Sequence, residues 1–386
     1  MTIPIITGVE LSGDATLPLL VVGPSLGTSA TALWSHVADR LGRQFHVVGW
    51  NLPGHDGAPV GEPFTMTELA AGVLSYVDGI RRVRADDRRF VYAGVSAGGA
   101  VGLQLLLDAS TEIGAAALLC TGARIGTAEA WQERAATVRS SGTPSMVTNS
   151  AQRWFATGFL EKEPAVGTAL LDVLQHTDAE GYAQVCEALA DFDVRDRLCE
   201  ITAPVLAVAG AADVPTPPAS LEEIASGVGQ GRVVVFDEIA HLAPAETPDR
   251  VARLLRDHLL PSPTLREAYD NGMVVRREVL GEAHVDRATA AITPFTEEFQ
   301  ELITQYAWGT IWTRPGLDRR SRSMITLSVL IARGNHEELA MHLRAAIRNG
   351  LTEEEIKELI LQTAIYCGVP EANTAFRIAS DTISHL

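Results

Sequence analysis

The chain has 386 residues, of which 46% are hydrophobic and 20% are charged, as in a globular protein with a sizeable core. Its formal net charge of −17 argues against nucleic acid or an anionic membrane surface as a partner. No apolar run approaches the ~20 residues that cross a bilayer, residues 1–10 lack a signal-peptide pattern, and the four cysteines form no C-x-x-C pair. We therefore expect a cytoplasmic protein without a disulfide framework or a structural metal site.

Residues 1–260 alternate short apolar runs with helical stretches, for example at 67–80 and 101–107. Several of the runs are continuously apolar, which is typical of strands buried on both faces of a parallel sheet. This alternation predicts a doubly wound α/β domain. The expected strands cover residues 5–11, 17–22, 45–50, 90–95, 115–120, 205–209 and 233–236.

Residues 122–201 interrupt this alternation, because they contain amphipathic helical stretches and no strand pattern. We interpret them as a helical cap over the carboxyl ends of the strands, where sheets of this kind bind their ligands. The segment carries Trp131, Trp154, Phe155 and Tyr182. Since large aromatic side chains are usually buried, any one of them is more readily explained as cap core than as a ligand contact.

A linker is predicted at residues 260–263, which contain two prolines. The following domain, residues 264–386, shows only helical patterns, at 297–308, 324–333, 337–349, 353–367 and 370–385. Thr352 followed by Glu355 predicts a capping box. We expect a small all-α domain.

The segment 94–98, Gly-Val-Ser-Ala-Gly, lies between a predicted strand and a predicted helix, which is the context of a nucleophile elbow. In such folds an acid and then a histidine follow the serine along the chain. Asp213 and His241 each follow a predicted strand, so both are expected at the same sheet edge as Ser96. We predict a catalytic triad of these three residues.

An oxyanion hole requires two backbone N–H groups near the nucleophile. We assign them to Ala97, directly after Ser96, and to Leu26, in the loop after the strand at 17–22. His55, in the loop after the strand at 45–50, is interpreted as structural.

Four runs of the first 260 residues form a distinctive set: 25–28 (Ser-Leu-Gly-Thr), 94–99, 123–126 (Ala-Arg-Ile-Gly) with Trp131, and 216–218 (Thr-Pro-Pro). Through these runs, residues 1–260 resemble the 3-oxoadipate enol-lactone hydrolases. The resemblance implies an α/β-hydrolase fold, and it implies that Arg124 and Trp131 face an acidic lactone. An arginine there is suited to pair with a carboxylate, although a plain surface cation is the alternative.

Residues 264–386 resemble the 4-carboxymuconolactone decarboxylases through the runs 272–281, 308–318, 338–342 and 364–370. Glu338 and His342 are four residues apart and share one helix face. Peroxidases of the wider superfamily carry C-x-x-C-x-x-x-H. The cysteine positions here are Asn335 and Glu338, which excludes that chemistry.

The two resemblances together imply a bifunctional enzyme that acts on small anionic lactones. Its decarboxylase half needs no cofactor or metal, because electrons from the departing carboxylate pass into the unsaturated lactone. His342 is the candidate acid, Glu338 tunes it, and the basic residues Arg319 and Arg322 are candidates for carboxylate binding. His284 is a second candidate histidine.

An alternative keeps a serine hydrolase for another small ester or lactone and makes the C-terminal domain a non-catalytic assembly module. Five short helices bury little core alone, so we expect a homo-oligomer through this domain in either case.

Overall fold

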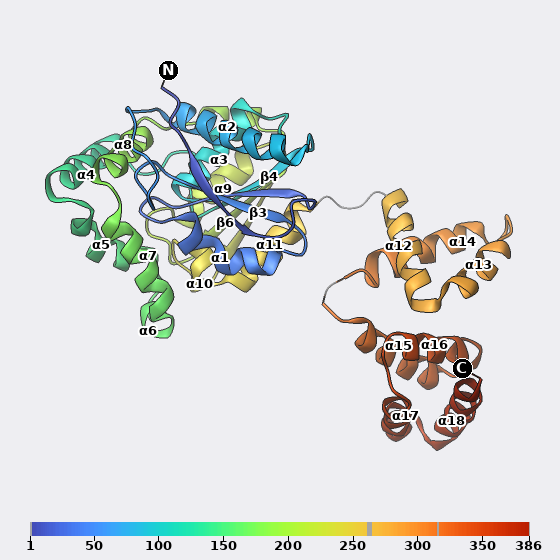
Figure 1. The fold of residues 1–386 in the computed structure, drawn as a ribbon. Helices are drawn as coiled ribbons and strands as arrows, with labels where there is room; N and C mark the ends of the chain where they lie inside the picture. The colour runs from blue at the N-terminus through green and yellow to red at the C-terminus, as the bar shows by residue number, and fades with distance from the viewer. Residues whose placement is uncertain (1, 261–264, 315, 386) are drawn as a thin grey trace. The chain divides into compact units, whose positions relative to one another are not determined.

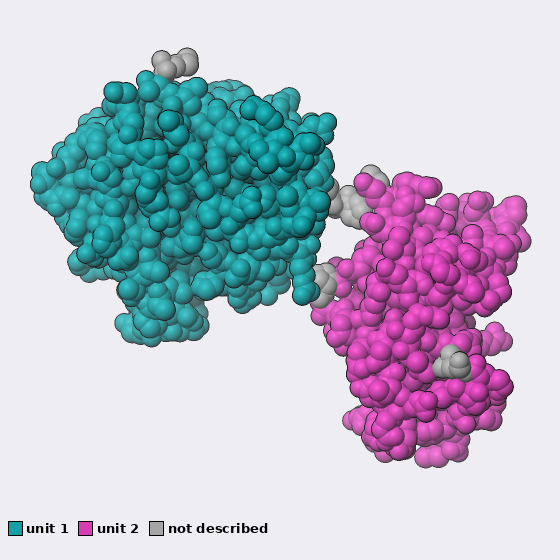
Figure 2. Space-filling model, in the orientation of Figure 1, with its two compact units in different colours: residues 1–261 teal, residues 262–386 magenta. Residues whose placement is uncertain are grey.

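The computed structural model describes residues 2–260, 265–314 and 316–385. It divides into two compact units, residues 1–261 and 262–386 (Figure 1 and Figure 2), each with its own hydrophobic core. The predicted linker lies outside the described residues apart from Leu260. Among the described residues, every helix is too short or too polar to span a bilayer.

The first unit is organised around one sheet, whose described strands have the order β1-β3-β2-β4-β5-β6-β7. Strands β2 to β7 run parallel, and β1 pairs antiparallel with β3 at one edge. All the predicted strands are present. They are β1 (Thr7–Ser12), β2 (Leu19–Gly23), β3 (His46–Asn51), β4 (Phe90–Val95), β5 (Ile113–Leu119), β6 (Val205–Gly210) and β7 (Gly231–Phe236).

Helices cover both faces of the sheet (Figure 1), which explains why the central strands are apolar at nearly every position. Helices α1 (Ala30–Leu41) and α11 (Pro248–Leu259) pack on one face, and α2 (Met66–Arg84) and α3 (Ala97–Asp108) pack on the other. Helix α9 (Pro218–Gly227) packs on β6 and β7. The parallel strands therefore end at a common edge, and β4, β6 and β7 lead into the predicted triad residues.

The predicted cap is helical in the structure and lies between β5 and β6. Helices α4 and α8 pack on each other, and the side chains of Trp154, Phe155 and Tyr182 are buried. The cap elements are α4 (Ala128–Ser141), η1 (Thr143–Met146), α5 (Val147–Trp154), α6 (Phe159–Lys162), α7 (Pro164–His176), α8 (Ala179–Ala190) and η2 (Arg195–Glu200). Short helices α10 (Ala243–Glu246) and α11 then follow β7.

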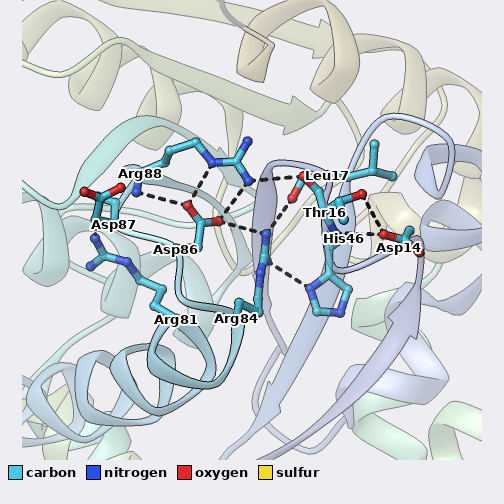
Figure 3. A network of polar contacts seen from close by, with 9 residues as sticks. All are labelled: Asp14, Thr16, Leu17, His46, Arg81, Arg84, Asp86, Asp87 and Arg88. Carbon is cyan, nitrogen blue, oxygen red and sulfur yellow. Dashed lines mark hydrogen bonds and ion pairs between the residues drawn. The ribbon is translucent and has the colours of Figure 1, made fainter.

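A polar network fastens the opposite, amino-terminal ends of the strands (Figure 3). Asp86 accepts hydrogen bonds from Arg84 Nη2 (2.9 Å) and Arg88 Nε (2.8 Å). Arg84, whose side chain is 4% exposed, also donates to the carbonyl of Leu17 (2.6 Å) and contacts His46 Nδ1 (3.0 Å). The end of α2 is thereby tied to the starts of β2 and β3.

The second unit is all-α, as predicted, and its helices are α12 (Leu265–Leu280), α13 (Glu282–Ala290), α14 (Glu297–Ile303), α15 (Arg319–Arg333), α16 (His336–Arg348), α17 (Glu353–Cys367) and α18 (Val369–Ser384). The capping box of Thr352 and Glu355 is present. Helices α12 and α13 were not predicted, because their polar residues obscure the apolar periodicity.

The single helix predicted at 297–308 is instead divided into α14 and a π-helical segment, η3 (Thr304–Ile311). Helix α12 packs directly on η3. A Cβ on Gly272 would lie 2.2 Å from the carbonyl oxygen of Thr304, so only glycine allows this approach. π-helical turns are often found at functional sites.

Candidate active sites

Ser96 lies on the tight turn between β4 and α3, and its φ of 55° is a strained value for a residue with a side chain. A Cβ on Gly98 would lie 2.6 Å from the backbone of Gly23, so glycine is required there. Thr121 Oγ1 donates to the carbonyl of Ser96 (2.7 Å), and the Tyr92 hydroxyl donates to the carbonyl of Gly98 (2.7 Å). These bonds hold the turn in the geometry of a nucleophile elbow.

His241 and Asp213 form a buried pair, with side chains 4% and 0% exposed. Nδ1 of His241 lies 3.0 Å from each carboxylate oxygen of Asp213. Asp213 also accepts hydrogen bonds from the backbone N–H (3.0 Å) and hydroxyl (2.7 Å) of Thr216. The carboxylate therefore holds the imidazole with its hydrogen on Nδ1, which leaves Nε2 as the acceptor. Ser96 and His241 line the same cavity.

The predicted oxyanion loop is held by His55. The N–H of Gly27 donates to His55 Nε2 (3.0 Å), and His55 Nδ1 donates to the carbonyl of Pro53 (2.9 Å). Burial lowers the pKa of His55 to about 4, so the ring is neutral and can accept at Nε2. Leu26, next to Gly27, lines the cavity. Ala97 is the first residue of α3. Its backbone N–H therefore has no carbonyl partner within the helix.

The cavity beside Ser96 has a volume of about 330 Å³ and is closed on one side by cap helices α4 and α5. Two lining arginines, Arg134 and Arg153, were not singled out in the sequence. Arg134 Nε donates to the Tyr182 hydroxyl (2.8 Å), and its guanidinium lies over the ring of Trp131 (5.6 Å).

The charges of the two cavity arginines are not compensated by ion pairs within the described residues. Neither Arg134 nor Arg153 forms an ion pair with any carboxylate of the described residues. Burial lowers the pKa of Arg153, and the nearby charge of Arg134 lowers it further. Glu133 lines the cavity as well but is exposed. The cavity is therefore suited to an anionic ligand that pairs with the guanidinium groups.

The prediction for Arg124 requires correction, whereas Trp131 does line the cavity. Arg124 is exposed and is not among the lining residues, because its neighbours Ala123 and Ile125 are buried and turn it outward. Arg134 was missed, although it lies three residues after Trp131 and so shares its helix face. For Arg153, no local pattern marked its position.

In the second unit, His342 and Glu338 occupy successive turns of α16. Burial lowers the pKa of His342, Glu338 raises it, and the charge of His284 lowers it again. Glu338 is exposed and forms no hydrogen bond with His342 among the described side chains. Nor does the described part of the chain bring three or more His, Cys, Asp or Glu residues together in a way that suits a metal ion.

The two arginines that were predicted to bind carboxylates of the substrate have protein partners in the structure. Arg319 forms an ion pair with Glu278 of α12. Arg322 donates to the carbonyls of Leu317 (3.2 Å) and Arg314 (2.9 Å). None of these contacts involves His342. Arg319 and Arg322 are three residues apart and share one face of α15. In the structure this face contacts α12 and the loop before α15.

The comparisons with known proteins match the two units separately. Residues 19–254 match the alpha/beta hydrolase family, and residues 297–381 match the carboxymuconolactone decarboxylase family. Over 238 residues, 61% of this chain, it is 33% identical to 3-oxoadipate enol-lactonase 2 of Acinetobacter baylyi and covers 86% of that protein. Over 120 residues, 31% of this chain, it is 46% identical to 4-carboxymuconolactone decarboxylase of the same organism and covers 90% of it.

A further relative of the second unit is the nitrosuccinic acid decarboxylase NpaB of Metarhizium robertsii, 47% identical over 121 residues, which are 31% of this chain and 85% of that protein. Among solved structures, the enol-lactonase from Burkholderia xenovorans superposes with a TM-score of 0.62 at 30% identity, over 66% of this chain and 96% of the other. The chain thus belongs to the α/β hydrolase family through its first unit and to the carboxymuconolactone decarboxylase family through its second.

Proposed function

We propose that the chain catalyses two consecutive reactions of aromatic catabolism, in the protocatechuate (3-oxoadipate) route. The second unit decarboxylates 4-carboxymuconolactone to 3-oxoadipate enol-lactone, and the first unit hydrolyses this enol-lactone to 3-oxoadipate. The names of the relatives support the two activities, and their presence in one chain supports the pairing. The observation that carries the hydrolase half is the buried Asp213–His241 pair, whose imidazole lines the same cavity as Ser96 and two arginines that form no ion pair among the described residues.

The proposed hydrolysis uses the predicted triad and oxyanion donors of the first site. Ser96 Oγ attacks the lactone carbonyl while His241 Nε2 accepts the hydroxyl proton, and Asp213 stabilises the imidazolium that forms. The N–H groups of Leu26 and Ala97 stabilise the oxyanion. Collapse of the tetrahedral intermediate breaks the ring C–O bond, and the enol oxygen takes the proton from His241. Water, activated by the same imidazole, then cleaves the acyl-enzyme, and the released enol becomes the ketone.

The carboxylate of the enol-lactone explains the two cavity arginines. Arg134 and Arg153 lie on the cap side of the cavity, across from the nucleophile's strand edge. A carboxylate bound there would hold the lactone ring at Ser96 through charge-assisted hydrogen bonds. Trp131, stacked on Arg134, provides an apolar surface for the ring.

Decarboxylation in the second unit requires no cofactor in this proposal. The bond between the ring γ-carbon and its carboxylate breaks, carbon dioxide leaves, and the electron pair passes through the double bond to the lactone carbonyl. A proton from His342 then adds at the α-carbon. Burial lowers the pKa of His342, and Glu338, one turn away, offsets part of this by favouring the protonated imidazole that this step uses.

Self-association through the second unit is part of the proposal. Its described surface carries large apolar side chains that a monomer leaves in water, including Phe295 (96% exposed), Ile365 (80%) and Tyr366 (78%). Light scattering of the full chain against residues 1–261 would detect this association. A monomeric full chain would contradict it.

The proposed location is cytoplasmic. All four cysteines are free in the described structure, and Cys120 and Cys186 are buried. Reduced cysteines are typical of proteins in a reducing compartment.

A second candidate substrate for the C-terminal unit is nitrosuccinic acid, since the similarity to the NpaB enzyme equals that to the carboxymuconolactone enzyme. Both compounds are dicarboxylic acids. Steady-state release of carbon dioxide from each, measured side by side, would show which is the better substrate.

The decisive experiment gives 4-carboxymuconolactone to the wild-type chain and to Ser96→Ala. We expect the variant to release carbon dioxide at the normal rate and to accumulate the enol-lactone. If neither protein consumes the starting material, the decarboxylase assignment fails. If Ser96→Ala still produces 3-oxoadipate at the wild-type rate, the hydrolase assignment fails.

A further inference from the structure

Two adjacent arginines of α12 have opposite surroundings. Arg277 is partly exposed and forms ion pairs with Glu282 and Asp286. Arg276 is only 7% exposed, and its hydrogen-bond partners are both neutral: Nη1 donates to Thr304 Oγ1 (3.1 Å) and Nη2 to Gln300 Oε1 (3.1 Å). Its buried Nε has no hydrogen-bond partner among the described residues.

A buried cation without a counter-ion is costly, because neutral hydrogen-bond partners replace only part of the lost hydration. No carboxylate of the described residues forms an ion pair with Arg276, and burial lowers the pKa of its guanidinium. If Arg276 served only to pack the core, an uncharged side chain of similar size would give a more stable fold. The charge is therefore best explained by an anion that binds beside it.

Two of the histidines in this unit, His284 and His342, adjoin one apolar cluster to which the helix of Arg276 contributes. Apolar residues of α12, α13, η3 and α16 form one cluster, in which Val285 follows His284 and Met341 precedes His342. Burial lowers the pKa of the His284 imidazole, and the charges of Arg287 and Arg276 lower it further. The charge of His284 in turn lowers the pKa of His342.

Most of the other charges that act on these two histidines are also positive. Arg287 of α13 and Arg344 of α16 both act on His284, and neither forms an ion pair among the described residues. The exposed Glu338 is the acid that acts on His342. In a chain with a net charge of −17, such a concentration of unpaired positive charge is unexpected for a plain surface.

We propose that α12, α13, α16 and η3 form a dicarboxylate-binding site in which Arg276 binds one carboxylate of the substrate beside His284 and His342. Arg287 and Arg344 supply positive charge for the second carboxylate. This inference rests on the proposed decarboxylase function for its substrate, but it assigns the anion contact to a residue other than Arg319 and Arg322. The π-helical turn at Thr304 positions the hydroxyl that orients the guanidinium.

The test compares Arg276→Gln with Arg277→Gln in the full-length chain. We expect Arg276→Gln to lower kcat/KM for carbon dioxide release ~30- to 100-fold, the loss typical of a charge-assisted hydrogen bond. The Arg277→Gln control should change it less than ~3-fold, since it removes exposed ion pairs. Enol-lactone hydrolysis by the first unit should be unchanged in both.

Thermal unfolding separates a binding role from a structural one. Because Arg276→Gln removes a buried unpaired charge, its Tm should equal or exceed that of the wild type. A lower Tm together with lower activity would show that Arg276 is structural. Wild-type activity in this variant would also overturn the proposal.

A binding measurement keeps the inference independent of the substrate assignment. Succinate, a stable dicarboxylate, should shift the imidazole resonances of His284 and His342 in the wild type, and the neutral succinamide should not. Arg276→Gln should lose this response, and Arg277→Gln should retain it. If the wild type binds succinate in this way but leaves 4-carboxymuconolactone untouched, the anion site stands and the proposed reaction fails. If succinate shifts neither histidine, the anion site fails.

Discussion

The backbone N–H of Gly27 donates a 3.0 Å hydrogen bond to Nε2 of His55, which is 28 positions later in the chain. Through this bond a neutral, fully buried imidazole positions the loop that carries the proposed oxyanion donor Leu26. His55 was expected to be structural. In the structure it holds the loop of Gly27, which is next to Leu26 in the first site.

Replacing His55 with Leu removes the acceptor for Gly27 and should lower kcat for enol-lactone hydrolysis ~10- to 100-fold. This is less than the loss of an oxyanion donor itself, because the loop is misplaced rather than deleted. His55→Gln retains an acceptor and should recover part of the rate. Carbon dioxide release by the second unit serves as the internal control, and full hydrolytic activity in His55→Leu would contradict the role.

The same residue should give the first unit a distinct pH dependence of stability. The folded-state pKa of His55, about 4, lies below the ordinary value of 6.5 because the ring is buried. Above pH 6.5 the ring is neutral in both states, but between pH 6.5 and 4 only the unfolded chain takes up the proton. The free energy of unfolding should therefore fall by about 3 kcal/mol over this interval.

Urea unfolding of the wild type and of His55→Gln at pH 7 and pH 4.5 measures this effect. The variant should show a smaller loss of stability between the two pH values. Equal losses in both proteins would show that His55 does not contribute to the acid sensitivity.

Arg134 and Arg153 should determine selectivity for anionic lactones. Changing either to Gln should lower kcat/KM for 3-oxoadipate enol-lactone ~30- to 100-fold, mainly through KM, because a charged contact to the carboxylate is lost. A neutral enol-lactone, with methyl in place of the carboxymethyl group, should be hydrolysed at nearly the wild-type rate.

Arg124→Gln is the matched control, since Arg124 is exposed and lies outside the cavity lining. It should leave both substrates unaffected. A selective loss of enol-lactone hydrolysis in Arg124→Gln would restore the role implied by the family resemblance.

Asp86 should stabilise the first unit from the edge opposite the active site. Its hydrogen bonds with Arg88, and the charges of Arg88 and Arg84, lower its pKa to about 2 although partial burial opposes this. Since the folded-state pKa is depressed, the contribution is complete above pH ~4 and is lost as the pH falls through about 2. Asp86→Asn should cost about 2 kcal/mol at neutral pH.

Denaturant unfolding at pH 7 and pH 3 provides the measurement. The difference between wild type and Asp86→Asn should shrink at the lower pH. Asp87→Asn is the control, because Asp87 is exposed and should change stability by less than ~0.5 kcal/mol. Equal effects of the two substitutions would contradict the assignment.

Local patterns in the sequence were sufficient for the elements of the first unit. Buried parallel strands are continuous apolar runs, and an elbow requires glycines at fixed offsets from Ser96, so both leave a signature within a few residues. The placement of Asp213 and His241 followed from the rule that parallel strands end at one edge. In the second unit, apolar periodicity predicted the later helices but not α12, whose buried face includes Gly272 and Arg276.

The sequence alone thus determined the strand order along the chain, the helical cap, the all-α second unit and the positions of Ser96, Asp213 and His241 after parallel strands that end at one edge. Only the tertiary structure decided which arginines line the first cavity, Arg134 and Arg153 rather than Arg124, and which described arginine of the second unit is buried with neutral partners, Arg276 rather than Arg319. The physical reason is that turn chemistry and periodicity act between neighbours in the chain, whereas the rotation of a helix about its axis is set by the elements that pack against it. A cation's partner is therefore fixed only when those elements are in place.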